Sequence, residues 1–379
     1  RFFLSVGHCY HILWGSAIHT LAATIDRDFD FLPKVNDWVK KFQILEESNV
    51  TGHYVDSSYA IAPLGIRAIY EGQAIFNQMQ YLASAADRSL PLSYFEDIGM
   101  LHGIYKEAFD LFLKLSHLSP PLATLDPVVG LFLLVCDLSI NSNNGFPLDI
   151  YDYDNFIVTN DPGQRFCTLS VIISKNTQLY CNRIGNYSKE NYIELSKELC
   201  ESMGTKCSYE SIKNVLGWID KNNVRNILEE ERSLKYSEEN LSIRIILSKY
   251  IRFQEDKWEC PHVFCWFGIH AASGVEGVDV EYIRTLFNKH HAPFVEGDDG
   301  EVKPVLFEGR NEENIASSFN SFYNFIIFYD IVKQWVSEEG DFTFDYTWLS
   351  NKSNSELIAY VKKAFKDQFD VSMDDIIVV

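Results

Sequence analysis

The 379 residues are 46% hydrophobic and 14% aromatic, which is enough apolar material for one large folded unit or two moderate ones. The formal net charge of −20 argues against nucleic-acid binding and against docking on anionic membranes, because both require clustered Lys and Arg. The eight cysteines are widely spread, and no signal peptide is visible, although the chain begins with Arg1. We therefore expect a cytoplasmic protein with free thiols and a protein partner.

The spacing of apolar residues predicts a mainly α fold, a multi-helix globular array that allows a short strand pair. In the first part of the chain, helices are predicted over residues 6–22, 63–86, 93–115 and 128–140. Ser93 is the expected N-cap of the third of these helices. The fourth is apolar on every side, so we expect it to be buried, although Asp137 interrupts its apolar run.

Residues 141–161 are rich in Asn, Asp, Gly and Pro and form the best candidate boundary. We expect a helical domain over residues 1–150 and a second, mainly helical domain over residues 151–379 that is docked on the first. Asp161 followed by Pro162 predicts an N-cap and the first helical position of the next helix. Further helices are predicted over residues 189–203, 209–221, 241–254, 280–290, 313–336 and 355–369, with an exposed acidic loop at 295–304.

Glu71 is the residue that raises a functional question, because its carboxylate stands among apolar positions in the stretch AIYEGQAIFNQMQYL. A carboxylate on a buried helix face needs a partner, since an unpaired charge there costs several kcal/mol. Arg67, one helical turn earlier, can supply an ion pair. The alternative partner is a metal ion.

Glu71, Gly72 and Ala74 form the pattern Glu-Gly-x-Ala, which resembles the third-ligand helix of gluzincin-type zinc peptidases. In that family the other two ligands come from an upstream helix with the motif His-Glu-x-x-His. Here the upstream segment VGHCYHILWG holds His8 and His11, which lie on one side of a helix. The resemblance, which covers only the N-terminal part of the chain, implies a His₂Glu zinc site at His8, His11 and Glu71.

The sequence departs from the family pattern, because the histidines are spaced His-x-x-His and Cys9 stands where the general base belongs. The resemblance therefore implies a metallopeptidase-like helical protein that lacks regular peptidase activity. The alternative is an acidic all-α scaffold or interaction protein with no metal and no catalysis, in which Glu71 is paired with Arg67. The sequence leaves open whether the protein is an enzyme.

A second group of possible metal ligands lies in the stretch WECPHVFCW, which contains Cys260, His262 and Cys265, with His270 close behind. A Cys-x₄-Cys pair can begin a zinc site, but a closed site needs two further ligands. The flanking Val, Phe and Trp residues favour buried core thiols instead.

Overall fold

A computed structural model describes residues 18, 20–50, 53–54, 62–86, 90–141, 161–272, 279–291, 294–296, 302–305, 311–337 and 354–376. The chain divides into two compact units. Unit 1 comprises Arg1–Arg225 with Tyr250–His291, and unit 2 comprises Asn226–Lys249 with Ala292–Val379. These units differ from the division at residue 150 that we expected from the sequence, because residues 151–225 belong to unit 1.

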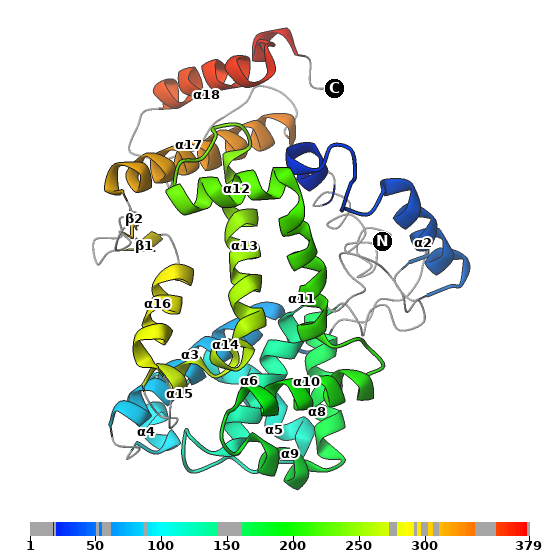
Figure 1. The fold of residues 1–379 in the computed structure, drawn as a ribbon, viewed down its shortest axis with the longest axis vertical. Helices are drawn as coiled ribbons and strands as arrows, with labels where there is room; N and C mark the ends of the chain where they lie inside the picture. Colours follow the sequence, from blue (N-terminus) through cyan, green and yellow to red (C-terminus); the bar gives the residue numbers. More distant parts are fainter. Residues whose placement is uncertain are drawn as a thin grey trace. The chain divides into compact units, whose positions relative to one another are not determined.

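The described residues are mainly α-helical, which confirms the predicted fold class (Figure 1). Unit 1 holds α2 (Val35–Glu47), α3 (Ile66–Ala85), α4 (Leu92–Asp97), α5 (Ile104–Ser116), α6 (Pro127–Ile140), α8 (Pro162–Ser174), α9 (Thr177–Ile184), α10 (Lys189–Ser202), α11 (Ser208–Leu216), the 3₁₀ turn η2 (Gly217–Asp220), α14 (Pro261–Cys265), α15 (Phe267–Ala271) and α16 (Val280–His290). Unit 2 holds β1 (Phe294–Glu296), β2 (Val302–Pro304), α17 (Glu312–Ser337), α18 (Asn354–Phe369) and the 3₁₀ turn η3 (Met373–Asp375). Two further helices, α12 (Asn222–Ser233) and α13 (Leu241–Glu259), belong in part to each unit.

Strands β1 and β2 pair antiparallel in the region where the sequence predicted an exposed acidic loop. They form the short strand pair that the predicted fold class allowed. None of the helices in the described part of the chain combines the length and the apolar character that crossing a membrane requires.

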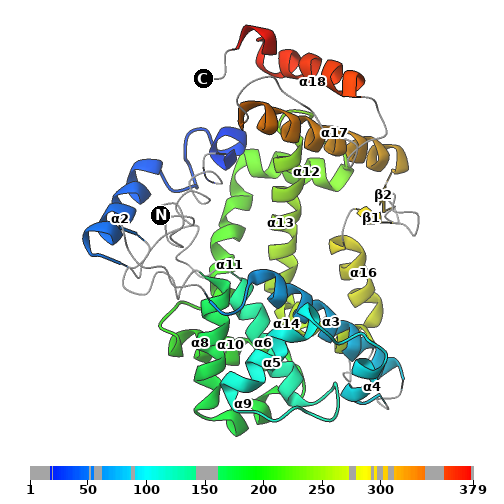
Figure 2. The same ribbon diagram turned by 180° about the vertical axis from the view of Figure 1, so that it is seen from behind.

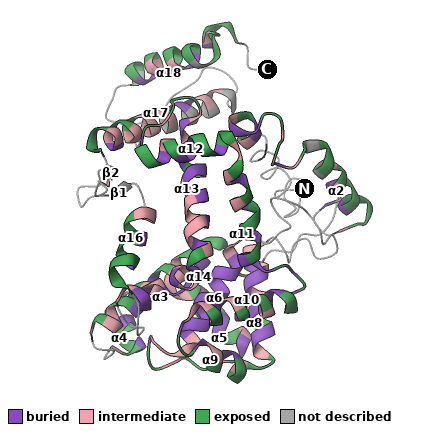
Figure 3. Cartoon of the chain, viewed as in Figure 1, coloured by how far each residue is buried: buried purple, intermediate pink, exposed green. Residues whose placement is uncertain are grey.

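Helix α6 is the most deeply buried element of unit 1. Every residue from Val129 to Ser139 is buried, and α3, α8, α9 and α10 all contact this helix (Figures 1–3). A helix that is apolar on all sides can bury all of its side chains only in such an interior position. Its start is well defined, because the side chain of Asp126 accepts a hydrogen bond from the Val128 N–H at 2.8 Å.

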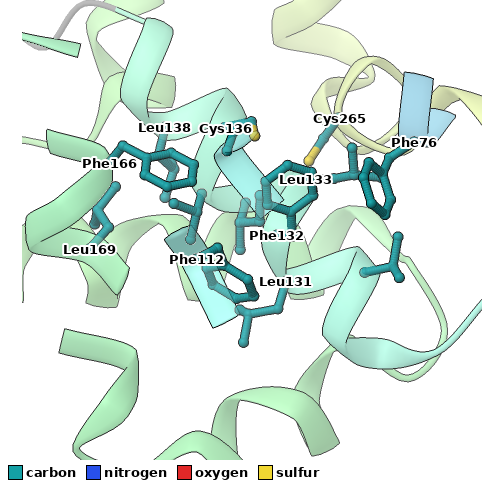
Figure 4. Close-up of a cluster of buried hydrophobic side chains, with 14 of the residues drawn as sticks. Phe76, Phe112, Leu131, Phe132, Leu133, Cys136, Leu138, Phe166, Leu169 and Cys265 are labelled. Carbon is teal, nitrogen blue, oxygen red and sulfur yellow. The ribbon is translucent and has the colours of Figure 1, made fainter. Parts of the chain in front are cut away.

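Phe132 of α6 lies at the centre of a cluster of phenylalanine rings (Figure 4). Its ring centroid is 5.0 Å from that of Phe76, 5.0 Å from Phe109, 5.7 Å from Phe112 and 6.3 Å from Phe166. Tilted and edge-on arrangements at these distances are favourable for aromatic pairs. One ring thus joins α6 to α3, α5 and α8.

Two glycines allow backbones in unit 1 to approach each other more closely than side chains would permit. A Cβ atom on Gly268 of α15 would lie 1.8 Å from the carbonyl oxygen of Asn77 on α3. The Gly268 N–H donates instead to Asn77 Oδ1 at 2.9 Å. A Cβ atom on Gly130 of α6 would lie 2.6 Å from Cγ2 of Ile184 on α9. The close contacts of α15 with α3 and of α6 with α9 therefore depend on glycine.

Unit 2 has a smaller core between α17 and α18. Its buried members are Phe328, Ile331, Leu357, Val361, Phe365 and Met373. The ring of Trp335 packs edge-on against Phe365 at a centroid distance of 5.6 Å. The Ser318 hydroxyl of α17 donates to the Leu234 carbonyl at 2.9 Å, which ties α17 to the segment after α12.

The helix predicted over residues 93–115 is wrong as a single element, because α4 ends at Asp97 and α5 begins at Ile104. Gly99 has φ +75° and Gly103 has φ +51°, and a right-handed helix cannot pass through such residues. Ser93 is not the N-cap either, since α4 begins directly after Pro91. The predicted cap at Asp161 is confirmed, because its side chain accepts hydrogen bonds from the Gly163 and Gln164 N–H groups.

We predict that Gly268→Ala lowers the free energy of unfolding by about 2 kcal/mol or more, because the added methyl group forces α15 away from α3. Denaturant-induced unfolding followed by circular dichroism measures the change. Gly217→Ala is the matched control, since a Cβ there meets nothing within 4 Å and its φ of −61° suits alanine. Equal stability of the two variants would contradict the interpretation of Gly268.

Candidate functional site

The structure places one of the three expected zinc ligands. Glu71 lies on α3, whereas His8 and His11 lie outside the described residues. Whether the two histidines approach Glu71 therefore stays a prediction from the sequence.

Glu71 does not lie on the buried face of α3, which corrects the expectation from the sequence. Its side chain is 34% exposed, whereas the next residue, Gly72, is buried. Glu71 Oε1 is 3.7 Å from Nε of Arg67, whose side chain is 80% exposed. The ion pair considered from the sequence is thus present, but an exposed pair of this kind contributes less than about 1 kcal/mol to stability.

Gly72 lies where α3 meets α5 and α6. A Cβ atom there would lie 3.3 Å from Cβ of Ala108 and 3.3 Å from Cζ of Phe132. From the sequence we expected Gly72 to allow another helix to approach α3 closely. The helices that the structure places beside it are α5 and α6. Ala74, which was expected on the same side, is exposed.

The cysteines of the stretch WECPHVFCW are buried, as the interpretation as core thiols predicts. Cys265 is 0% exposed, and burial, with the nearby Asp137 carboxylate, raises the pKa of its thiol well above the usual value. The Cys260 thiol donates to the Asp256 carbonyl at 3.0 Å, as a small buried side chain commonly does.

His262 and His270 form a perpendicular ring pair with a centroid distance of 5.0 Å. Nε2 of His270 hydrogen-bonds to the Tyr187 carbonyl at 3.2 Å, so this nitrogen carries the proton. Burial, followed by the positive charge of Lys189, lowers the pKa of His262 to about 4, and burial, followed by the neighbouring His262, lowers that of His270 to about 4. Both rings are therefore neutral at physiological pH. Within the part of the chain that the structure describes, no three or more His, Cys, Asp or Glu side chains are grouped so as to hold a metal ion.

The main polar centre of unit 1 surrounds Asp137, in the middle of the buried helix α6. Lys257 Nζ donates to Asp137 Oδ1 at 2.6 Å, and both side chains are only 3% exposed. The Tyr192 hydroxyl donates to Oδ2 at 2.6 Å, and the Asn141 side-chain amide donates to Oδ1 at 3.0 Å. Burial, followed by the charge of Asp137, raises the pKa of Tyr192 well above its usual value, so this hydroxyl remains a donor.

A second buried cation, Arg165 of α8, lies near the end of α6. Its Nη2 donates to the Leu138 carbonyl at 2.5 Å and to the Ser208 hydroxyl at 3.0 Å. The Ser208 hydroxyl also donates to the Asn141 carbonyl at 3.3 Å. The polar groups of α6, α8 and α11 thus form one continuous hydrogen-bonded network.

The Asp137 centre joins helices. Its buried carboxylate accepts hydrogen bonds from donors on α10, α13 and the end of α6, so it stabilises the contacts of these helices. We did not predict this centre from the sequence. The available signal was Asp137 itself, the one charge in the most apolar run, because a buried carboxylate requires a charged or hydrogen-bonding partner.

Comparison of the chain with protein-family models, with curated proteins and with solved structures gives no match.

We predict that Lys257→Ala lowers the free energy of unfolding by about 3–5 kcal/mol, because it leaves the buried Asp137 carboxylate without a counter-ion. Urea denaturation measures the loss. The double variant Asp137→Leu, Lys257→Met should recover much of it, since it removes both charges of the pair together. Lys197→Ala is the control, because Lys197 contacts Glu201 at 4.0 Å on the surface. A loss as small as that of Lys197→Ala would show that the Asp137 pair contributes no stability.

Proposed function

We propose that this protein binds another protein through an exposed apolar face of α3. We define this α3 face as Ile66, Tyr70, Ala74, Tyr81 and Ala85. All five residues are exposed, with exposed fractions of 45% for Ile66, 51% for Tyr70 and 46% for Tyr81. The proposal rests on this single observation, that α3 presents apolar side chains to solvent as well as to the core.

The α3 face follows one side of the helix, and it is interrupted between Ala74 and Tyr81, where Asn77 contacts Gly268 of α15. At 3.6 residues per turn, its five members fall within about 100° of the helix circumference, and they extend along nearly the whole helix, about 30 Å. An apolar sector of this width is what a helix normally turns towards a core. On α3 that role is already taken by the opposite side, where Ile69, Phe76 and Met79 are each 0% exposed.

The α3 face also lacks acidic residues, although the chain has 53 of them and a net charge of −20. The charged residue within its sector is Arg67, and Glu71 lies at its edge. Depletion of charge together with tyrosine is typical of the centre of protein–protein interfaces. The partner that fits is a protein surface or helix with apolar side chains and an acidic residue placed to meet Arg67.

The second candidate is the zinc site at His8, His11 and Glu71 in a metallopeptidase-like protein without regular peptidase activity. The observation that favours it is the state of Glu71, whose side chain is 34% exposed and whose Oε1 lies 3.7 Å from Nε of Arg67. A carboxylate held so weakly keeps an oxygen available for a metal ion. The protein-binding proposal is stronger, because it rests only on residues that the structure describes.

Site-specific crosslinking tests the α3 face. With a benzophenone amino acid at position 70, we expect the protein to form one defined adduct with a partner in the cells that produce it. Tyr81→Glu in the same chain should reduce the adduct about tenfold or more, because it places a charge at the centre of the apolar interface.

The crosslinker at Leu179 is the matched control, since this α9 residue is 44% exposed but outside the α3 face. Leu179→Glu should leave the adduct from position 70 unchanged. Equal labelling from positions 70 and 179, or the absence of any adduct from position 70, would reject the α3 face as the binding surface.

Metal analysis distinguishes the two candidates. We expect Glu71→Gln and Arg67→Ala to change the free energy of unfolding by less than about 1 kcal/mol, because the pair is exposed, and neither to change bound zinc. Stoichiometric zinc in the purified protein that is lost in Glu71→Gln and His11→Ala, but retained in Arg67→Ala, would instead support the His₂Glu site.

A further inference from the structure

Two cysteines meet where α10 ends and α11 begins. Cys200 lies in the last turn of α10, and Cys207 is the N-cap residue of α11. Both are free thiols, with exposed fractions of 0% for Cys200 and 4% for Cys207. Their side chains hydrogen-bond to each other, so the two sulfur atoms are direct neighbours.

The turn between the two cysteines holds them together. The Thr205 N–H donates to the Cys200 carbonyl at 2.9 Å, and the Thr205 hydroxyl donates to the same oxygen at 3.2 Å. This turn lies at the surface, where Gly204 and Lys206 are exposed. Because Cys200 and Cys207 are themselves buried, a small solute reaches the two sulfur atoms only when this turn opens.

The surroundings of Cys200 stabilise a thiolate. Besides the Cys207 thiol, its sulfur accepts a hydrogen bond from the N–H of Ser208, in the first turn of α11. The positive charge of Arg165 acts on the same sulfur, and Arg165 is fixed in place by its bonds to Leu138 and Ser208. A helix N-terminus and a neighbouring cation are the features that activate cysteine thiols.

These contacts, first among them the hydrogen bond from Cys207, lower the pKa of Cys200 to about 7, and the same bond raises that of Cys207. The other fully buried thiols behave in the opposite way. Burial raises the pKa of Cys136 and that of Cys265 well above the usual value. Cys200 thus differs from its buried counterparts through its neighbours and not through its burial.

We propose that Cys200 and Cys207 are a redox pair that a hydroperoxide converts into a disulfide across the α10–α11 turn. The Cys200 thiolate attacks one peroxide oxygen, the O–O bond breaks, and the leaving oxygen takes up a proton, so Cys200 becomes a sulfenic acid. The Cys207 sulfur then attacks the Cys200 sulfur, the S–O bond breaks, and the hydroxide leaves with the Cys207 proton as water. With hydrogen peroxide, two thiols are oxidised and one peroxide is reduced to two waters.

The disulfide would change the polar network beside it. Oxidation removes the negative charge on Cys200, so Arg165 loses an interaction within a buried region. It also links α10 covalently to α11. This redox pair is independent of the α3 face, and each can be rejected without the other.

Peptide mapping after limited treatment with hydrogen peroxide tests the pair. We expect the peptides that contain Cys200 and Cys207 to be recovered joined by a disulfide, at a rate about tenfold higher than the loss of the Cys136 or Cys265 thiol. The rate should increase as the pH rises through about 7 and then level off, because only the Cys200 thiolate attacks.

Variants of the two cysteines distinguish the thiol that attacks the peroxide, Cys200, from the thiol that then forms the disulfide, Cys207. In Cys207→Ser, the sulfenic acid on Cys200 should persist and react with dimedone, whereas Cys200→Ser should leave Cys207 unmodified. Cys181→Ser is the matched control, and the Cys200–Cys207 disulfide should form in it at the unchanged rate. Recovery of both thiols unmodified in the wild-type chain, while Cys167 or Cys181 is oxidised, would overturn the proposal. Oxidation of Cys200 to a sulfinic acid without a disulfide would do so as well.

Discussion

The fold of unit 1 depends on hydrogen-bonding partners for the buried carboxylate of Asp137. This carboxylate lies within the most apolar helix of the chain, where a charge without partners would cost several kcal/mol. The carboxylate accepts hydrogen bonds from Lys257, Tyr192 and Asn141, at 2.6, 2.6 and 3.0 Å. Apolar packing tolerates small rotations of one helix against another, but these directional bonds do not. The Asp137 centre therefore fixes how α10 and α13 are rotated about their axes where they meet α6.

The fold class was predictable from the sequence, because burial of one helix face leaves a regular apolar spacing. The bounds of α6, α10 and α16 follow this spacing closely. The break between α4 and α5 was not predictable in the same way, since apolar residues continue at helical spacing through it. The positive φ angles of Gly99 and Gly103 end the helix there, and the spacing of side chains carries no information on φ.

The position of Glu71 shows a second limit of sequence reasoning. Helix α3 is apolar on both sides, so the spacing alone does not tell which side faces the core. We assigned Glu71 to the buried side, yet Ile66, Tyr70 and Tyr81 are the residues that reach solvent beside it. Asp137 was visible in the sequence as an irregularity, but its partner Lys257 lies 120 residues further along the chain, and no local pattern joins the two.

The distance in sequence between Asp137 and Lys257 also has a consequence for synthesis. Unit 1 is interrupted by residues 226–249, which belong to unit 2, so its final segment leaves the ribosome late. At about 5–20 residues per second, the 120 residues between the two charges correspond to a delay of roughly 6–24 s. During that time α6 has been made but its counter-ion has not. Until Lys257 has been made, the nascent chain therefore contains a partly assembled core whose most apolar helix lacks its counter-ion. Aggregation would start from this intermediate, and a chaperone that prevents aggregation would bind it.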